Sequence, residues 1–430
     1  MYSLFWNKRL TGTTAHRLIL LVLVACVACA SSSGGGFEVQ SVAARGAGMG
    51  GVLSMLTGSP TAAYVNPASM TSLRGTYFSF GTTVTMPNFR FTEQGTGGSS
   101  TKMQTQALFP PNFCLIHTFD SGLGFGVTAT IPYSIKTDWG VDWPGRRVIA
   151  SSELRGIVVT PMMAFRATRA VSIGCGLNIT AFRYTRSARV GAPAAQGNVE
   201  GTEQLQGDAD AAYGFQAGLL VVPDQVFSFG FVYKSRSRVS IENGSVEYDW
   251  PADLLPGAAL TTDKFSTSLT LPDKVHAGVS IRPFEALLLA GELEYVRWSS
   301  IDRVTISVGD PATKLIDDQE GWKDIVTAHI GAEFQLGEVA LRAGITLDRS
   351  PIPDAQMRPS IPDGTRAAYT AGIGYAIGEG LTLDVALQSV VYDDRTITNA
   401  AVSSATGQPL NGTYVMNATV VGLNVSYSWK

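Results

Sequence analysis

Residues able to do acid–base or nucleophilic chemistry are scattered in this sequence. Its histidines, His16, His117, His276 and His329, lie far apart along the chain. The sequence contains no H-E-x-x-H zinc motif, no G-x-S-x-G nucleophile turn and no phosphate-binding P-loop. A serine–histidine pair brought together only in space, as in a barrel lipase, is the enzymatic alternative. The pattern indicates a protein that is not an enzyme and that needs neither a metal nor another cofactor.

Charged residues recur at alternate positions in two segments. Glu292 and Glu294 form one such pair, and Lys234, Arg236 and Arg238 form the other set. Alternate residues of a β-strand point to the same face, so each set is expected to lie on one surface, the lumen of a barrel. The cationic set could meet a carboxylate headgroup, and solvated lumen charge is the other interpretation.

The N-terminus has the pattern of an export signal. Three basic residues precede the apolar segment Leu18 to Ala25, and Ala28-Cys29-Ala30 fits the A-x-A cleavage site. We expect residues 1–30 to be a signal peptide. The alternatives are a membrane anchor and a lipoprotein signal in which Cys26 is lipidated. Cleavage would leave Cys114 and Cys175, of which Cys175 is expected to act as a small apolar residue, with a disulfide between them as the alternative.

Composition favours a membrane protein built from strands. Charged residues make up 16% of the chain, against about 25% in soluble domains. The one long apolar run, Leu18 to Ala30, is short for a membrane-spanning helix, which needs about 20 residues. Without the leader the net charge changes from −3 to −6 (29 basic minus 35 acidic residues). This mild charge and the lack of a basic block give no reason to expect a nucleic-acid partner.

Apolar and small polar residues alternate along most of the chain, as in Val171 to Thr180 and Leu123 to Tyr133. This period of two is typical of strands with one face toward lipid and one toward a lumen. We expect an all-β fold, a 14-stranded antiparallel transmembrane β-barrel. Its strands are predicted near 75–86, 106–119, 122–133, 152–168, 170–187, 204–221, 225–241, 264–281, 285–298, 322–336, 338–348, 365–378, 380–391 and 416–429.

The connections between these strands alternate in length. Short turns, such as Asp120-Ser121 and Gly337, alternate with long polar loops, such as 134–151 and 392–415. An even strand count with short turns at one end and long loops at the other is typical of outer-membrane barrels. The last strand ends in the aromatic residue Trp429, as barrel assembly signals do, which predicts the barrel assembly machinery as a partner.

The segment before the first strand does not alternate. It is rich in small residues, such as Arg45 to Gly51 and Ala62 to Ala68, and has too little bulk for an independent domain. A barrel of fourteen strands leaves a lumen that such a segment can block. We therefore divide the mature chain into a plug, residues 31–74, and a barrel, residues 75–430.

Several motifs, in order, resemble the outer-membrane long-chain fatty-acid and aromatic-hydrocarbon transporters (FadL/TodX type). They include Asn66-Pro67-Ala68, Leu271 to Gly278, Glu294 to Ser299, Trp322 to Asp324 and Ile361 to Arg366. The resemblance implies a monomeric barrel in the outer membrane, plugged at its periplasmic end and surrounded by outer-membrane lipid. It implies passive uptake of a long-chain fatty acid or other hydrophobic small molecule into a lumenal pocket, with lateral exit at a kinked third strand.

The same resemblance assigns site residues. Phe37 is expected to reach toward the ligand pocket, and Asn66, Pro67 and Ala68 to belong to the plug, although spacing alone fits an ordinary Asn-Pro turn. Pro132 is expected to mark the kink in the third strand, because proline removes a ladder donor, or simply the end of that strand. The alternatives for function are a non-transporting barrel, serving as an adhesin or structural protein, and a polar porin.

Overall fold

The structure, a computed structural model, describes residues 35–39, 41–95, 98–194, 197–250, 260–309, 313–401 and 409–429. The predicted signal peptide, the candidate lipidation site Cys26 and the first residues of the predicted plug lie outside these ranges. No helix among the described residues is long and apolar enough to cross a membrane.

Strands dominate the described chain. The plug contains the helix α2 (Ala44–Gly48) and the 3-10 helices η1 (Pro60–Tyr64) and η2 (Pro67–Ser72), and two further 3-10 turns, η3 (Trp298–Ser300) and η4 (Asp354–Gln356), lie in loops. The strands are β1 (Gly75–Glu93), β2 (Ser100–Lys102), β3 (Pro111–Thr118), β4 (Leu123–Asp138), β5 (Ser151–Arg166), β6 (Val171–Ala194), β7 (Gly197–Asp208), β8 (Ala212–Val221), β9 (Phe227–Lys234), β10 (Ser237–Asp249), β11 (Leu260–Leu271), β12 (Lys274–Phe284), β13 (Leu287–Val296), β14 (Arg303–Val308), β15 (Thr313–Gln319), β16 (Ile325–Leu336), β17 (Val339–Asp348), β18 (Arg366–Ile377), β19 (Leu381–Tyr392), β20 (Arg395–Ile397) and β21 (Gly412–Trp429).

These strands form one closed antiparallel barrel. Neighbouring strands pair in chain order, and β1 pairs with β21 from Thr76 opposite Trp429 to Glu93 opposite Gly412. Three strands of the wall are each interrupted once, as β7/β8, β9/β10 and β11/β12. Counted this way, the described residues form the predicted fourteen strands, which confirms the fold. Closure satisfies the backbone polar groups that an open sheet edge would expose to lipid.

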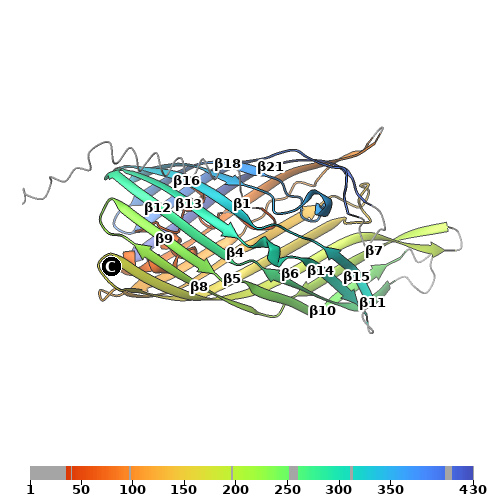
Figure 1. The fold of residues 1–430 in the computed structure, drawn as a ribbon, viewed down its shortest axis with the longest axis horizontal. Helices are drawn as coiled ribbons and strands as arrows, with labels where there is room; N and C mark the ends of the chain where they lie inside the picture. Colours follow the sequence, from red (N-terminus) through yellow and green to blue (C-terminus); the bar gives the residue numbers. More distant parts are fainter. Residues whose placement is uncertain are drawn as a thin grey trace, which may run out of the picture.

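The structure corrects some predicted boundaries. The second and tenth strands begin at Pro111 and Ile325 rather than at 106 and 322, and the predicted loops contain the short strands β2, β14, β15 and β20. The interruption between β11 and β12 falls at Pro272-Asp273, where proline has no N–H to donate to a ladder. Figure 1 shows β14 and β15 at the end of the barrel opposite the C-terminus. The long loops therefore gather at one end, which is the extracellular end in outer-membrane barrels.

The wall separates an apolar outer face from a filled lumen. Exposed side chains on the outside are mostly aromatic or aliphatic, including Phe215, Phe231, Ile373, Leu387 and Leu423. Such a continuous apolar exterior suits a hydrocarbon environment. Inside, Arg45 of the plug forms a two-point ion pair with Glu333 of β16, which also accepts from Arg342 of β17. Charged side chains are thus placed in the lumen and neutralised there.

The plug packs closely against the inner wall because many wall residues that face it are glycines. A Cβ added at Gly230 of β9 would come within 2.3 Å of the Ser54 carbonyl oxygen, and one at Gly174 of β6 within 2.6 Å of the Ala68 nitrogen. Apolar plug residues complete the contact, with Met49, Leu53 and Leu56 packed near Val232 and Leu288 of the wall. Glycines in this barrel therefore leave room for plug backbone.

We predict that Gly230→Val displaces the plug without unfolding the barrel, because the new side chain would overlap plug backbone only. Conductance in planar bilayers should rise, while the folded protein still migrates faster unboiled than boiled on a gel. The control is Gly191→Val in β6, whose Cβ would meet nothing closer than 3.9 Å. Equal conductance of the Gly230→Val and Gly191→Val proteins would contradict this arrangement.

Candidate functional site

The lumen contains an apolar cavity on the extracellular side of the plug. Aliphatic side chains from several strands and loops supply most of its wall, and Phe37 and Phe182 add aromatic rings. The aliphatic residues are Ile135, Val148, Ile149, Leu154, Val239, Ile241, Leu269, Ile301, Val304, Ile306, Ile316, Ile352 and Ile361. Concave apolar pockets with a few polar groups are the usual binding sites for small hydrophobic molecules. This cavity is the candidate site.

Phe37 of the plug lies at the centre of an aromatic cluster beside the cavity. Its ring is 5.2 Å from Trp298, 5.8 Å from Tyr133 and 6.0 Å from Trp322, and only 2% of the residue is exposed. The sequence motifs that contain Trp298 and Trp322 gave no sign of this role, since the two tryptophans are 24 residues apart (322 − 298). They meet because η3 and the segment just before β16 converge on the plug.

The charged residues that line this cavity are paired. Arg186 of β6 forms an ion pair with Glu203 of β7, and Arg358 forms one with Asp318 of β15. Glu320 lies 3.6 Å from the same guanidinium and accepts a hydrogen bond of 3.1 Å from the Trp322 indole. Burial raises the pKa of the Glu320 carboxyl, and the nearby Arg358 opposes that rise. Both arginines that line the cavity are therefore paired with carboxylates of the protein.

Pro132 lies at an irregularity in the pairing of β4, the third strand of the barrel. The register between β4 and β5 shifts between Thr130 and Tyr133, and β3 pairs with β4 only as far as Ala129. The edge of β4 beyond that point is bonded to the plug instead. Val39 N–H donates to the Pro132 carbonyl at 2.9 Å, and Ser134 N–H donates to the Phe37 carbonyl at 3.0 Å.

A second cavity lies at this interruption of the wall. It is lined on one side by Leu108 and Pro110 and on the other by Ser134 and Ile135, and Phe37 lines it as well. The two edges meet again nearer the extracellular end, where Gln104 N–H donates to the Asp138 carbonyl at 2.8 Å. Phe37 thus borders both the apolar cavity and the gap in the wall.

Asn66, Pro67 and Ala68 lie elsewhere, where the plug meets the inner wall. The Asn66 amide donates to the carbonyls of Ser54 at 2.7 Å and Leu219 at 3.1 Å, and its oxygen caps η2 by accepting from Ala68 N–H at 3.0 Å. Pro67 occupies the first turn of η2, where a missing N–H costs nothing. Neither of the two cavities that Phe37 lines includes these three residues. The structure therefore places them apart from Phe37, where the plug is hydrogen-bonded to the wall.

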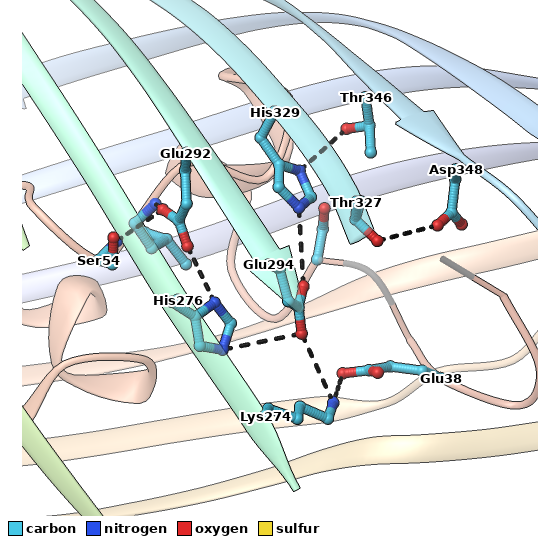
Figure 2. Close-up of polar contacts among 12 residues, drawn as sticks. Glu38, Ser54, Lys274, His276, Glu292, Glu294, Thr327, His329, Thr346 and Asp348 are labelled. Atoms are coloured by element: carbon cyan, nitrogen blue, oxygen red, sulfur yellow. Dashed lines mark hydrogen bonds and ion pairs between the residues drawn. The ribbon is translucent and has the colours of Figure 1, made fainter. Parts of the chain in front are cut away.

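Next to Phe37 along the chain, the plug is held by charged side chains of the neighbouring strands β12, β13 and β16 (Figure 2). Glu38 forms an ion pair with Lys274 of β12, whose ammonium lies 3.8 Å from Glu294 of β13. Glu292 of β13 accepts hydrogen bonds of 2.9 Å from the backbone N–H groups of Leu53 and Ser54. The prediction that Glu292 and Glu294 face the lumen is confirmed. Glu292 contacts the plug directly, and Glu294 contacts it through Lys274.

Two histidines complete this network. His276 Nδ1 lies 3.0 Å from Glu292, and His329 Nδ1 lies 2.7 Å from the Gly50 carbonyl, to which it must donate. The other nitrogen of each ring faces Glu294, at 3.7 Å and 3.6 Å. Figure 2 shows that Lys274, Glu294, Glu292 and the two histidines form one chain of contacts between the barrel wall and the plug backbone.

The prediction that Lys234, Arg236 and Arg238 all face the lumen is wrong for Arg236 and Arg238. Lys234 is in the lumen and donates to the Tyr64 carbonyl at 3.1 Å, whereas Arg236 and Arg238 are exposed. The break between β9 and β10 shifts the alternation, so that Ser237 and Val239 face the interior. Cys114 and Cys175 are both free, one buried and the other exposed, so the alternative disulfide is absent.

We predict that Lys274→Met destabilises the protein by about 3–5 kcal/mol, because it leaves Glu38 and Glu294 buried without their cation. The free energy of unfolding would be measured in detergent from tryptophan fluorescence against urea. Adding Glu38→Gln to this variant should restore part of the loss.

The control for this series is Lys136→Met, which removes a lysine from an exposed ion pair with Glu153. That change should cost about 1 kcal/mol or less. Equal losses for Lys274→Met and Lys136→Met would show that the buried network does not hold the plug.

Comparisons with known proteins agree with this architecture. A family model described as outer membrane protein transport protein (OMPP1/FadL/TodX) matches residues 24–429. The long-chain fatty acid transport protein of Escherichia coli strain K12 is 24% identical over 358 residues, covering 74% of this chain and 79% of that protein. A putative outer membrane protein of Neisseria meningitidis is 22% identical over 261 residues, covering 56% and 55% of the two chains.

Solved structures show the same fold. A Pseudomonas aeruginosa FadL homologue has a TM-score of 0.80 at 19% identity, covering 92% of this chain and 100% of that one. The toluene transporter TodX of Pseudomonas putida has a TM-score of 0.71 at 16% identity, covering 91% and 99%. With the family match extending over nearly the whole sequence, this chain belongs to the outer membrane protein transport protein family (OMPP1/FadL/TodX).

Proposed function

We propose that this protein carries hydrophobic molecules passively across the outer membrane, through the apolar cavity and out sideways at the gap beside β4. The observation that supports this route most directly is the position of Phe37, which lines both the cavity and the gap. Among the described residues, Phe37 and Ile135 are the two that line both cavities, so a molecule that moves from one to the other would pass beside this ring. Phe37 is therefore the proposed gate, and Pro132 marks the kink that keeps the wall open.

The substrate class follows from the lining and from the relatives. Aliphatic and aromatic side chains suit fatty acids or aromatic hydrocarbons. A fatty-acid transporter and a toluene transporter are among the similar proteins, which supports the same range of ligands. Lateral exit has a physical advantage, because each CH₂ that leaves water for an apolar phase gains about 0.8 kcal/mol.

Asn66, Pro67 and Ala68 are proposed to hold the plug in the lumen rather than to contact the ligand. Their hydrogen bonds join the plug to itself at Ser54 and to the wall at Leu219. Small changes in the plug can then accompany passage of a ligand past Phe37 while this anchor stays fixed. We expect the protein to act as a monomer, inserted by the barrel assembly machinery.

The alternative functions fit less well. An adhesin has no use for an apolar cavity inside the barrel, and a polar porin needs an open lumen rather than one filled by a packed plug. A lipase needs a serine hydrogen-bonded to a histidine. In the part of the chain that the structure describes, His117, His276 and His329 are bonded instead to Thr76, Glu292 and Gly50.

We predict that a disulfide across the gap stops uptake while the outer loops stay intact. Leu108→Cys and Ser134→Cys, which line opposite sides of the gap, would be joined in a background of Cys114→Ser and Cys175→Ser. Bridging requires Cα atoms within about 7 Å, so formation of the bond would be checked first. Oxidised cells should lose uptake of labelled toluene or fatty acid, and a reducing agent should restore it.

The matched control joins Phe113→Cys to Ala129→Cys, which lie directly opposite each other where β3 and β4 are already paired. Oxidation of this pair should leave uptake unchanged. Normal uptake through a fully bridged Leu108–Ser134 pair would rule out lateral exit.

We also predict that Leu269→Trp in β11 weakens ligand binding by filling the cavity that Leu269 lines. Displacement of a fluorescent hydrocarbon probe should require about tenfold more ligand, equivalent to roughly 1.4 kcal/mol of lost apolar contact. Leu383→Trp, on the outer face of β19, is the control and should bind as the natural protein does. Equal affinities of the two variants would show that the ligand lies elsewhere.

A further inference from the structure

The cations along the proposed route share one feature. Arg186 and Arg358 line the apolar cavity, and Lys136 and Arg366 line the cavity at the wall gap. Each of them forms an ion pair with a carboxylate of the protein, in the order Glu203, Asp318, Glu153 and Asp348. A ligand carboxylate entering either cavity would therefore find each of these cations already paired with a carboxylate of the protein.

Lys274 is a further cation beside the segment that contains Phe37. It pairs with Glu38, the residue that directly follows Phe37, and Glu38 also lines the cavity at the gap. The lysine side chain is 5% exposed and that of Glu38 is 18% exposed. Lys274 also lies 5.1 Å from the centre of the Tyr133 ring, within the aromatic cluster around Phe37. Glu38 thus places a carboxylate where the headgroup of a fatty acid passing Phe37 would meet Lys274.

Glu294 is the other carboxylate beside Lys274, and its position is less favourable than that of Glu38. Glu294 lies 3.8 Å from the ammonium, beyond direct hydrogen-bonding distance, and it also faces His276 and His329. The second lumenal lysine, Lys234, donates to a plug carbonyl. Among the described residues, removing Glu38 would therefore leave Lys274 with Glu294 alone, a carboxylate at ion-pair distance that is shared with two histidines.

We infer that Glu38 determines substrate specificity by acting as a built-in carboxylate that occupies Lys274, so that the route favours uncharged hydrophobic molecules over ionised fatty acids. The physical reason is the cost of burying a carboxylate without a partner. A neutral ligand needs no cation and pays no such cost. A free ammonium would instead give a ligand carboxylate a charge-assisted hydrogen bond.

The inference rests on the proposed function, and the test uses two ligands that differ only in their headgroup. Dodecanol and dodecanoate would each compete at pH 8 with an uncharged fluorescent probe bound to the purified full-length protein. The natural protein should bind dodecanol about tenfold more tightly than dodecanoate, and Glu38→Gln should lower this ratio about tenfold, the effect of one charge-assisted hydrogen bond. Glu38→Gln combined with Lys274→Met should return the ratio toward that of the natural protein.

The matched control is Glu379→Gln, which removes one negative charge from an exposed turn at the other end of the barrel. It should leave the ratio unchanged, and faster migration of unboiled protein would confirm that each variant is folded. Equal binding of both ligands by the natural protein, or the same ratio in Glu38→Gln, would overturn the inference while leaving transport intact. Failure of the probe and both ligands to bind would reject the proposed function itself.

Discussion

The contact between residues 37–39 and the kinked edge of β4 is the one on which the other functional features depend. A strand in a membrane barrel must satisfy its backbone groups on both edges, and β3 leaves part of β4 unpaired. The plug supplies the missing hydrogen bonds at Pro132 and Ser134. In doing so it brings Phe37 to the inner side of the gap. The same few bonds therefore satisfy the unpaired edge of β4 and position Phe37 beside it.

The rest of the plug is held in place by other contacts, which involve wall glycines and buried charged side chains. Wall glycines such as Gly230 and Gly174 allow plug backbone to approach the strands closely. Glu292 then accepts from two plug N–H groups, and Arg45 pairs with Glu333. Buried ions are costly unless paired and hydrogen-bonded, so these contacts favour one position of the plug.

Many of the charged groups inside the lumen are paired with one another. The cavity is apolar where a ligand would lie, and its few cations are neutralised by carboxylates of neighbouring strands. Glu38 extends the same rule to Lys274 at the gate. A protein can thus keep lysine and arginine inside its lumen, where they fix strands and plug, without offering them to a passing anion.

The sequence alone determined the architecture. Alternation with a period of two, short turns alternating with long loops, and a Gly-rich segment without alternation predicted fourteen strands and a plug, because these patterns depend on local geometry and on the two-sided environment of each strand. Tertiary structure decided which residues meet. Trp298, Trp322 and Phe37 come together from three separate segments, and the ion pair between Glu38 and Lys274 spans 236 positions. The break at Ser235-Arg236 turned Arg236 and Arg238 outward, since one irregular residue reverses every side chain after it. Long-range pairing and strand irregularities of this kind leave no periodic signal in a sequence.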